Sequence, residues 1–190
     1  MPQIARADPR SMSLPQLVSH GREAALRWRI EYPAFWEAFF QRLRELREEV
    51  RLVEAARLLH IFAQLRLVDL ELVDFCVQLV AEAEAEALLD LKEQELTQAA
   101  EALGAMQRPE AMAVVLRPLV ARVHRLDVGL LVRLLAVAKE VGCSMAGDLA
   151  DAGCRALVER NNNNNNTNNI VVVIVVIVVI VVVIVIVVVV

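Results

Sequence analysis

One apolar spacing recurs along residues 14–141 and constrains the fold more than any other feature of the chain. In LVEAARLLHIF, which begins at Leu52, apolar or small side chains stand at relative positions 0, 3, 4, 7 and 10. This spacing places them on one face of an α-helix. The template recurs from Leu96 and Leu131 and, more loosely, from Leu14, so its four starts are 38, 44 and 35 residues apart.

A second apolar template follows each of these helices after 18 to 22 residues, beginning at Trp36, Leu72, Leu116 and Leu149. A single helical hairpin cannot bury its apolar face, so repeated hairpins stack on one another. With only six Gly and six Pro, the chain also lacks the turns of an all-β domain. The pattern predicts an all-α fold, a right-handed α-hairpin repeat solenoid of about four units over residues 13–160.

Residues that start or stop helices mark several of the expected boundaries. Pro33 suits a first helical position, and Pro109 lies where the third unit is expected to turn. Asp69 and Asp127 suit N-caps, and Gly142 suits a helix end. Pro118 falls inside a predicted second helix, where it removes one backbone hydrogen bond and favours a kink.

Two segments leave an alternative fold open. No Gly, Pro, Ser or Asn occurs between Ala34 and Val68, and no Gly or Pro between Leu70 and Leu103. The run AEAEAE at 81–86 has the composition of a strong helix former and accounts for the long 44-residue interval. A plain bundle with long continuous helices therefore remains possible.

Charge is distributed unevenly along the chain, although the formal net charge is only −4. Residues 1–51 hold nine basic and seven acidic groups, residues 52–106 three and eleven, and residues 107–160 eight and six. The acidic middle is a poor electrostatic footprint for nucleic acid, which requires clustered positive charge. In one interpretation the segment 82–101 is a solvated helical face; in another it is an acidic docking face for a basic partner.

Two groups of arginines are the candidate RNA-binding residues, because a solenoid that binds RNA would carry such groups on its concave side. Solvated faces with acidic partners four residues away are the simpler interpretation of many of them. The candidates are Arg42, Arg44, Arg47, Arg51, Arg117, Arg122, Arg125 and Arg133.

The sequence carries no recognisable catalytic or metal-binding motif. Gly-rich phosphate loops and the GxSxG, HExxH and DxDxDG patterns do not occur. The three histidines are far apart, and the three cysteines, which form no CxxC, are expected to be reduced structural thiols. We therefore expect no enzyme activity, no cofactor and no metal.

Three stretches carry a resemblance to a known class of repeat protein: 52–80, 96–120 and 126–142, the last reading LDVGLLVRLLAVAKEVG. They resemble the degenerate α-hairpin repeats of heptatricopeptide and octotricopeptide repeat proteins, organellar proteins of apicomplexan parasites and algae related to the RAP and FAST-kinase class. The resemblance spans residues 14–158 and implies RNA or ribonucleoprotein binding in a mitochondrion or plastid, for RNA processing or ribosome assembly. The chain departs from this class in its acidic middle and in lacking the RAP domain itself.

The two ends of the chain differ from the repeat region. Residues 1–12 are expected to be a disordered or targeting start, since the Arg-rich beginning weakly matches an organellar transit peptide. Residues 161–169 hold eight Asn and one Thr, a poly-Asn linker, and residues 170–190 are only Val or Ile. This tail is long enough to span a bilayer as a helix, so a tail-anchored membrane protein is one interpretation; a translated simple repeat is the other.

The function predicted from the sequence is therefore non-catalytic binding by a helical repeat domain, with organellar RNA or ribonucleoprotein as the first candidate partner. A protein-protein interaction scaffold that uses the acidic face 82–101, and a membrane protein anchored through 170–190, are the alternatives.

Overall fold

The computed structural model describes residues 8–27, 33–65 and 69–164, and all regular structure in these ranges is helical. The longer helices are α1 (Leu14–Arg27), α2 (Pro33–Glu45), α3 (Leu52–Leu65), α4 (Leu70–Ala81), α6 (Glu93–Ala105), α7 (Pro109–Ala121), α8 (Val128–Glu140) and α9 (Ala146–Asn164). Shorter elements are α5 (Ala85–Leu89) and the 3₁₀ turns η2 (Pro9–Ser11), η3 (Arg47–Glu49) and η4 (Val123–Arg125).

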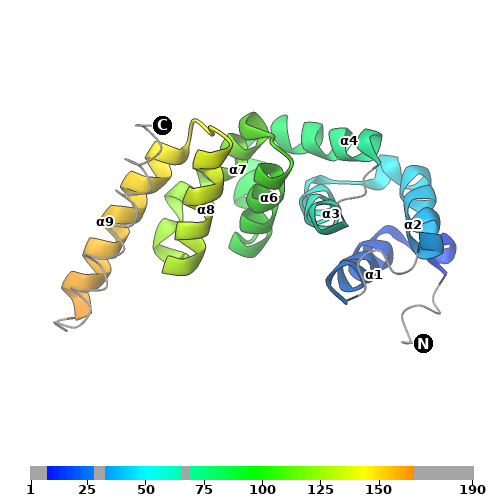
Figure 1. Ribbon diagram of the computed structural model, residues 1–190, viewed down its shortest axis with the longest axis horizontal. Helices are drawn as coiled ribbons and strands as arrows, with labels where there is room; N and C mark the ends of the chain where they lie inside the picture. Colours follow the sequence, from blue (N-terminus) through cyan, green and yellow to red (C-terminus); the bar gives the residue numbers. More distant parts are fainter. Residues whose placement is uncertain (1–7, 28–32, 66–68, 165–190) are drawn as a thin grey trace.

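The helices pack in chain order along the long axis of the molecule (Figure 1). Four consecutive pairs are in contact as hairpins: α1 with α2, α3 with α4, α6 with α7, and α8 with α9. The first helices also contact one another in the order α1, α3, α6, α8, and the second helices α4, α7 and α9 do the same. Every apolar template identified in the sequence begins in one of these eight helices, and three of them end just past it, at Met106, Val123 and Val141.

The long continuous helices that a plain bundle would require do not form. Helix α2 ends at Glu45, and the chain then makes the turn η3 before α3 begins at Leu52. Val50 is extended, with φ −66° and ψ 120°, and its side chain is buried. The helical stretch is therefore interrupted by the burial of an apolar side chain, at a place where the sequence has no Gly or Pro.

The interpretation of AEAEAE at 81–86 as a strong helix former is wrong. Helix α4 ends at Ala81, Glu84 is extended with φ −64° and ψ 146°, and α5 begins only at Ala85. Leu88 in α5 is buried, so its burial overrides the local helix propensity of the Ala-Glu run. The extra residues of the 44-residue interval hold α5.

A buried apolar residue stands two positions before the start of each first helix. Met12, Val50, Leu91 and Leu126 occupy this position, and each is at most 7% exposed. Met12 and Leu126 are extended like Val50, and all three follow a 3₁₀ turn. Each first helix therefore enters the core through an anchored turn that the apolar template did not include.

Of the expected disordered or targeting start, residues 1–7 lie outside the described residues, and residues 8–12 hold η2 and the core residue Met12. Helix α9 continues to Asn164, into the segment expected to be a poly-Asn linker. The remainder of that segment and the Val/Ile tail 170–190 lie outside the described residues. Among the helices that are described, none is long and apolar enough to cross a membrane.

Most of the expected helix boundaries are confirmed. The carboxylates of Asp69 and Asp127 accept hydrogen bonds from the third residues after them, Leu72 and Leu130. Gly142 has φ +69°, the left-handed conformation that favours glycine at a helix end. Pro118 is buried inside α7, which continues through it to Ala121.

Helices α6 and α8 approach closely at Gly104. A Cβ atom at this position would overlap Cγ1 of Val137 and come within 3.5 Å of the sulfur of Met112. Valine is stiff at χ1, so it has little freedom to move aside. Gly104 therefore sets the spacing between two successive first helices.

We expect Gly104→Ala to lower the free energy of unfolding by about 1–2 kcal/mol, because the overpacking outweighs the gain in helix propensity. Chemical denaturation would measure the change. The control is Gly147→Ala, where an added Cβ meets nothing within 4 Å. A stability of Gly104→Ala equal to or above that of the unsubstituted chain would contradict the close approach.

Candidate binding surfaces

The arginines of the two candidate RNA-binding groups mostly face other parts of the protein. Arg44 is paired with Asp69, the N-cap of α4, and Arg47 lies 2.8 Å from Glu71 and stacks over the ring of Phe75 at 4.5 Å. These contacts join the first hairpin to the second. Exposed pairs of this kind add little energy singly, but they fix the orientation of one hairpin on the next.

The second group of arginines makes the equivalent contacts on α6. Arg125 lies 2.8 Å from Glu93, at the start of α6, and Arg133 of α8 lies 3.3 Å from Glu101. Glu93 also has Arg122 at 3.7 Å. A hydrogen bond from its own backbone amide, then one from Arg125, lowers the pKa of Glu93, so this carboxylate stays ionised beside its cations.

Arginine side chains from three second-helix ends hold the anchored turns. Arg42 donates from Nε to the carbonyl oxygen of Met12 (3.0 Å), Arg122 to that of Leu91 (2.8 Å), and Arg160 to that of Leu126 (2.9 Å). Arg122 and Arg160 each bond a second carbonyl two residues earlier, at Leu89 and His124. The acceptor lies two residues before the first helix in all three hairpins.

The sequence carried a signal for these contacts that apolar spacing did not use. An arginine follows each acceptor by 30 to 34 residues, and Arg160 was not among the candidates. Arg57 and Arg108 were not candidates either, because clustering in the sequence does not reveal a partner in another hairpin. Arg57 pairs with Glu95 and Arg108 pairs with Asp74, in each case between neighbouring hairpins.

Two of the eight candidate arginines, Arg51 and Arg117, make no such contact. Both are exposed, and neither side chain has an ionic or hydrogen-bond partner within the described residues. They lie on different elements, Arg51 just before α3 and Arg117 in α7. RNA binding by the eight residues stays a prediction, in which six side chains would have to exchange contacts within the protein for phosphates.

The acidic segment 82–101, like the set of arginines, holds both paired and exposed side chains. Glu93, Glu95 and Glu101 are paired with arginines of neighbouring hairpins. Glu84, Glu86 and Asp90 are exposed, with no cationic partner in the part of the chain that the structure describes. The unpaired acidic surface is therefore confined to the neighbourhood of α5.

An apolar groove of about 240 Å³ lies between α5 and α7, and these acids stand next in sequence to its lining residues Ala83, Ala85 and Leu89. Leu88, Leu89, Val114 and Pro118 form much of its wall, and Arg117 also lines it. Leu89 is 49% exposed, unusual for a large apolar side chain. We call this site the α5–α7 groove.

Among the described residues, no group of three or more His, Cys, Asp or Glu could hold a metal ion. Burial raises the pKa of Cys76 to about 12, against the lowering effect of the charge of Arg47. Burial also raises the pKa of Cys143 and Cys154. All three thiols are unpaired and stay protonated near neutral pH, which makes them weak nucleophiles.

No protein-family model matches the chain, and neither the curated proteins nor the solved structures give a match. The resemblance to heptatricopeptide and octotricopeptide repeat proteins, with the organellar location that it implies, therefore stays a prediction.

We expect Arg122→Ala to lower the free energy of unfolding by about 1–2 kcal/mol, because it leaves the carbonyls of Leu89 and Leu91 without their donor. Arg117→Ala removes a similar side chain from α7, the helix that Arg122 follows, and is expected to change stability by less than about 0.5 kcal/mol. Thermal or chemical denaturation of both variants provides the comparison. Equal effects would show that Arg122 does not hold the turn.

The Arg57–Glu95 pair makes stability depend on pH. Burial acts to raise the pKa of Glu95, but hydrogen bonds from Arg57 and the Lys92 amide, with the charges of both residues, outweigh it and hold the pKa below its ordinary 4.5. Ionised Glu95 therefore adds stability above about pH 4.5, and this contribution is lost as the pH falls through the lowered folded-state pKa.

We expect Glu95→Gln to lose less stability than the unsubstituted chain as the pH falls below about 4.5. Denaturation at a series of pH values would measure the slope. The control is Glu159→Gln, an exposed carboxylate of α9 without an ion pair among the described residues, whose slope should match the unsubstituted chain. Identical slopes for all three proteins would contradict the role of the pair.

Proposed function

We propose that this protein is a non-catalytic helical-repeat scaffold that binds a basic amphipathic segment of a protein partner in the α5–α7 groove. The single observation that carries the proposal is the combination of an apolar groove, with Leu89 half exposed, and the exposed carboxylates of Glu84, Glu86 and Asp90, each next in sequence to a residue that lines it.

The proposal includes a right-handed α-hairpin solenoid of about four units as the architecture of the domain. Three observations support it: four consecutive hairpins pack in chain order, a buried residue anchors the start of each, and arginines from three second helices bond equivalent carbonyls. Repeat architectures of this kind present extended surfaces and are commonly used for binding.

The charge around the groove identifies the kind of segment that would fit. Apolar side chains of the partner would enter between Leu89, Val114 and Pro118, which removes apolar surface from water. Lysines or arginines on its flanks would meet the exposed carboxylates of α5. Arg117 is the cation among the lining residues, and its aliphatic stem can cover one side of the bound segment.

RNA binding is the competing proposal, and the contacts of the arginines weigh against it. Phosphate binding needs cations that are free to neutralise phosphates. Six of the eight candidates already contact carboxylates or carbonyls, whereas Glu84 and Glu86 would repel a nucleic acid at the groove.

A labelled amphipathic peptide of Leu and Lys and a scrambled peptide of the same composition would test the proposal by fluorescence anisotropy, with single-stranded RNA as a third probe. We expect the amphipathic peptide to bind more tightly than the scrambled one. Leu89→Asp and the double change Glu84→Lys with Glu86→Lys should each weaken binding about tenfold or more, through lost apolar contact and reversed charge.

Glu159→Lys reverses a single carboxylate on α9, outside the residues that line the groove, and is expected to leave the affinity unchanged. Two results would overturn the proposal. One is equal affinity for the two peptides in the unsubstituted chain. The other is tighter binding of RNA that weakens with salt and is lost on substitution of Arg51 and Arg117.

A further inference from the structure

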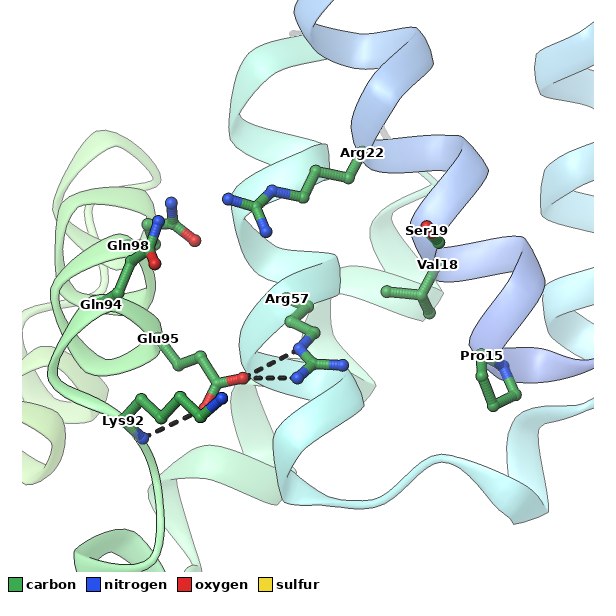
Figure 2. Close-up of a pocket in the computed structure, with 9 residues that line it drawn as sticks. All are labelled: Pro15, Val18, Ser19, Arg22, Arg57, Lys92, Gln94, Glu95 and Gln98. Carbon is green, nitrogen blue, oxygen red and sulfur yellow. Dashed lines mark hydrogen bonds and ion pairs between the residues drawn. The ribbon is translucent and has the colours of Figure 1, made fainter. Parts of the chain in front are cut away.

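A second, polar cleft lies on the first helices, away from the α5–α7 groove. It has a volume of about 310 Å³ and is lined by residues of α1, α3 and α6 and by Lys92 just before α6. Pro15 and Val18 form its apolar end, and the remaining lining residues are polar: Ser19, Arg22, Arg57, Lys92, Gln94, Glu95 and Gln98. Figure 2 shows these side chains around the space between the three helices.

One wall of the cleft is fixed by the ion pair between α3 and α6. Glu95 accepts hydrogen bonds from Nε of Arg57 (3.0 Å) and from Nη2 (2.6 Å), while its other oxygen accepts one from the Lys92 backbone amide at 3.1 Å (Figure 2). Glu95 thereby accepts three hydrogen bonds. It neutralises Arg57 and also interacts with the charge of Lys92, whereas it makes no ion pair with Arg22.

The guanidinium of Arg22 is the uncompensated charge in this cleft. Its side chain projects from α1 across the cleft toward Gln98 of α6 (Figure 2). Arg22 is half buried, and within the described residues it has no ion-pair or hydrogen-bond partner. A guanidinium in this position has lost part of its hydration without a compensating anion, which is unfavourable until an anion binds.

The chemistry of the lining matches a carboxylate. Arg22 offers a planar fork of N–H donors, Lys92 offers an ammonium group, and Gln94, Gln98 and Ser19 offer further donors. Val18 and Pro15 can pack against the methylene groups that carry an acidic side chain. We propose that this cleft binds a carboxylate of an acidic peptide segment, with Arg22 as the principal cation and Lys92 as the second.

The cleft suits a peptide better than a nucleic acid. Three cations line it against one carboxylate, and one of those cations is already neutralised by that carboxylate. This leaves charge for one or two carboxylates, on a protein whose formal net charge is −4. A polynucleotide would bring a phosphate at every residue, so most of its charge would remain unpaired.

His60 does not line the cleft, but the charge of Arg22 acts on it, so its titration can report on Arg22. Burial lowers the pKa of His60, and the positive charge of Arg22 lowers it further. An anion bound to Arg22 removes the second effect, so the His60 pKa should rise when the cleft is filled. Arg22→Gln should raise the His60 pKa in the absence of any ligand and abolish the further rise.

The experiment titrates the full chain with a labelled short peptide of Glu, Asp, Gly and Ser, followed by fluorescence anisotropy and by the NMR titration of His60. A C-terminally amidated version separates side-chain carboxylates from the terminal one. We expect Arg22→Gln to weaken binding about tenfold or more and Lys92→Gln to weaken it less. Arg27→Gln, on the same helix but paired with Glu23 outside the cleft, should bind as the unsubstituted chain does.

Arg22 has no partner to lose, so Arg22→Gln is expected to fold, and its stability is checked by denaturation. The proposal is overturned if the peptide binds Arg22→Gln and Arg27→Gln equally, or if saturating peptide leaves the His60 pKa unchanged. Tighter, Arg22-dependent binding of single-stranded RNA than of the peptide would also overturn it. The α5–α7 groove shares no residue with the cleft, so neither test decides the other.

Discussion

The structure depends on the burial of each first helix between its neighbours. Helix α3 buries seven side chains, which include Leu58, Leu59 and Phe62, and it contacts α1, α4 and α6. No single partner could cover so many positions on a helix of 14 residues, because an apolar stripe that packs on one neighbour is narrower. The fold is therefore held by successive contacts along the chain, and removing one hairpin would expose apolar surface on the next.

Charge then determines how the hairpins are oriented on one another. The sequence has an acidic middle between two segments of slight positive charge, and this pattern suggested a surface for an external partner. In the structure, many of the carboxylates in the acidic middle form ion pairs within the protein. Arg44 and Arg47 reach them from the first segment, and Arg125 and Arg133 reach them from the last. Charge complementarity between segments of this chain therefore serves to pack its hairpins together, and is not by itself a sign of an external partner.

The helices could be predicted from apolar spacing because each buries at least one face. The template residues Leu59 and Leu103, at equivalent positions of α3 and α6, are both fully buried. The breaks at Val50 and Glu84 could not, since they depend on tertiary burial of Val50 and Leu88 rather than on Gly or Pro. The candidate sites were also misjudged where they depend on tertiary contacts that the sequence does not show. Sequence clustering selected Arg122 and Arg125 as RNA ligands, but clustering carries no information about carboxylates and carbonyls 31 to 33 residues away.

Cations without a partner are therefore more informative than cations that cluster. A half-buried arginine is stabilised when its guanidinium is paired, and the chain supplies a carboxylate or a carbonyl to most of its arginines near hairpin boundaries. Arg22 is half buried and has no such partner within the described residues, although the Arg57–Glu95 pair lines the same cleft. Glu95, the carboxylate among the residues that line the cleft, is bonded to Arg57 and to the Lys92 amide and makes no ion pair with Arg22. The same ion pair that aligns α3 with α6 thus leaves the cleft between α1 and α6 positive and suited to an anion from outside.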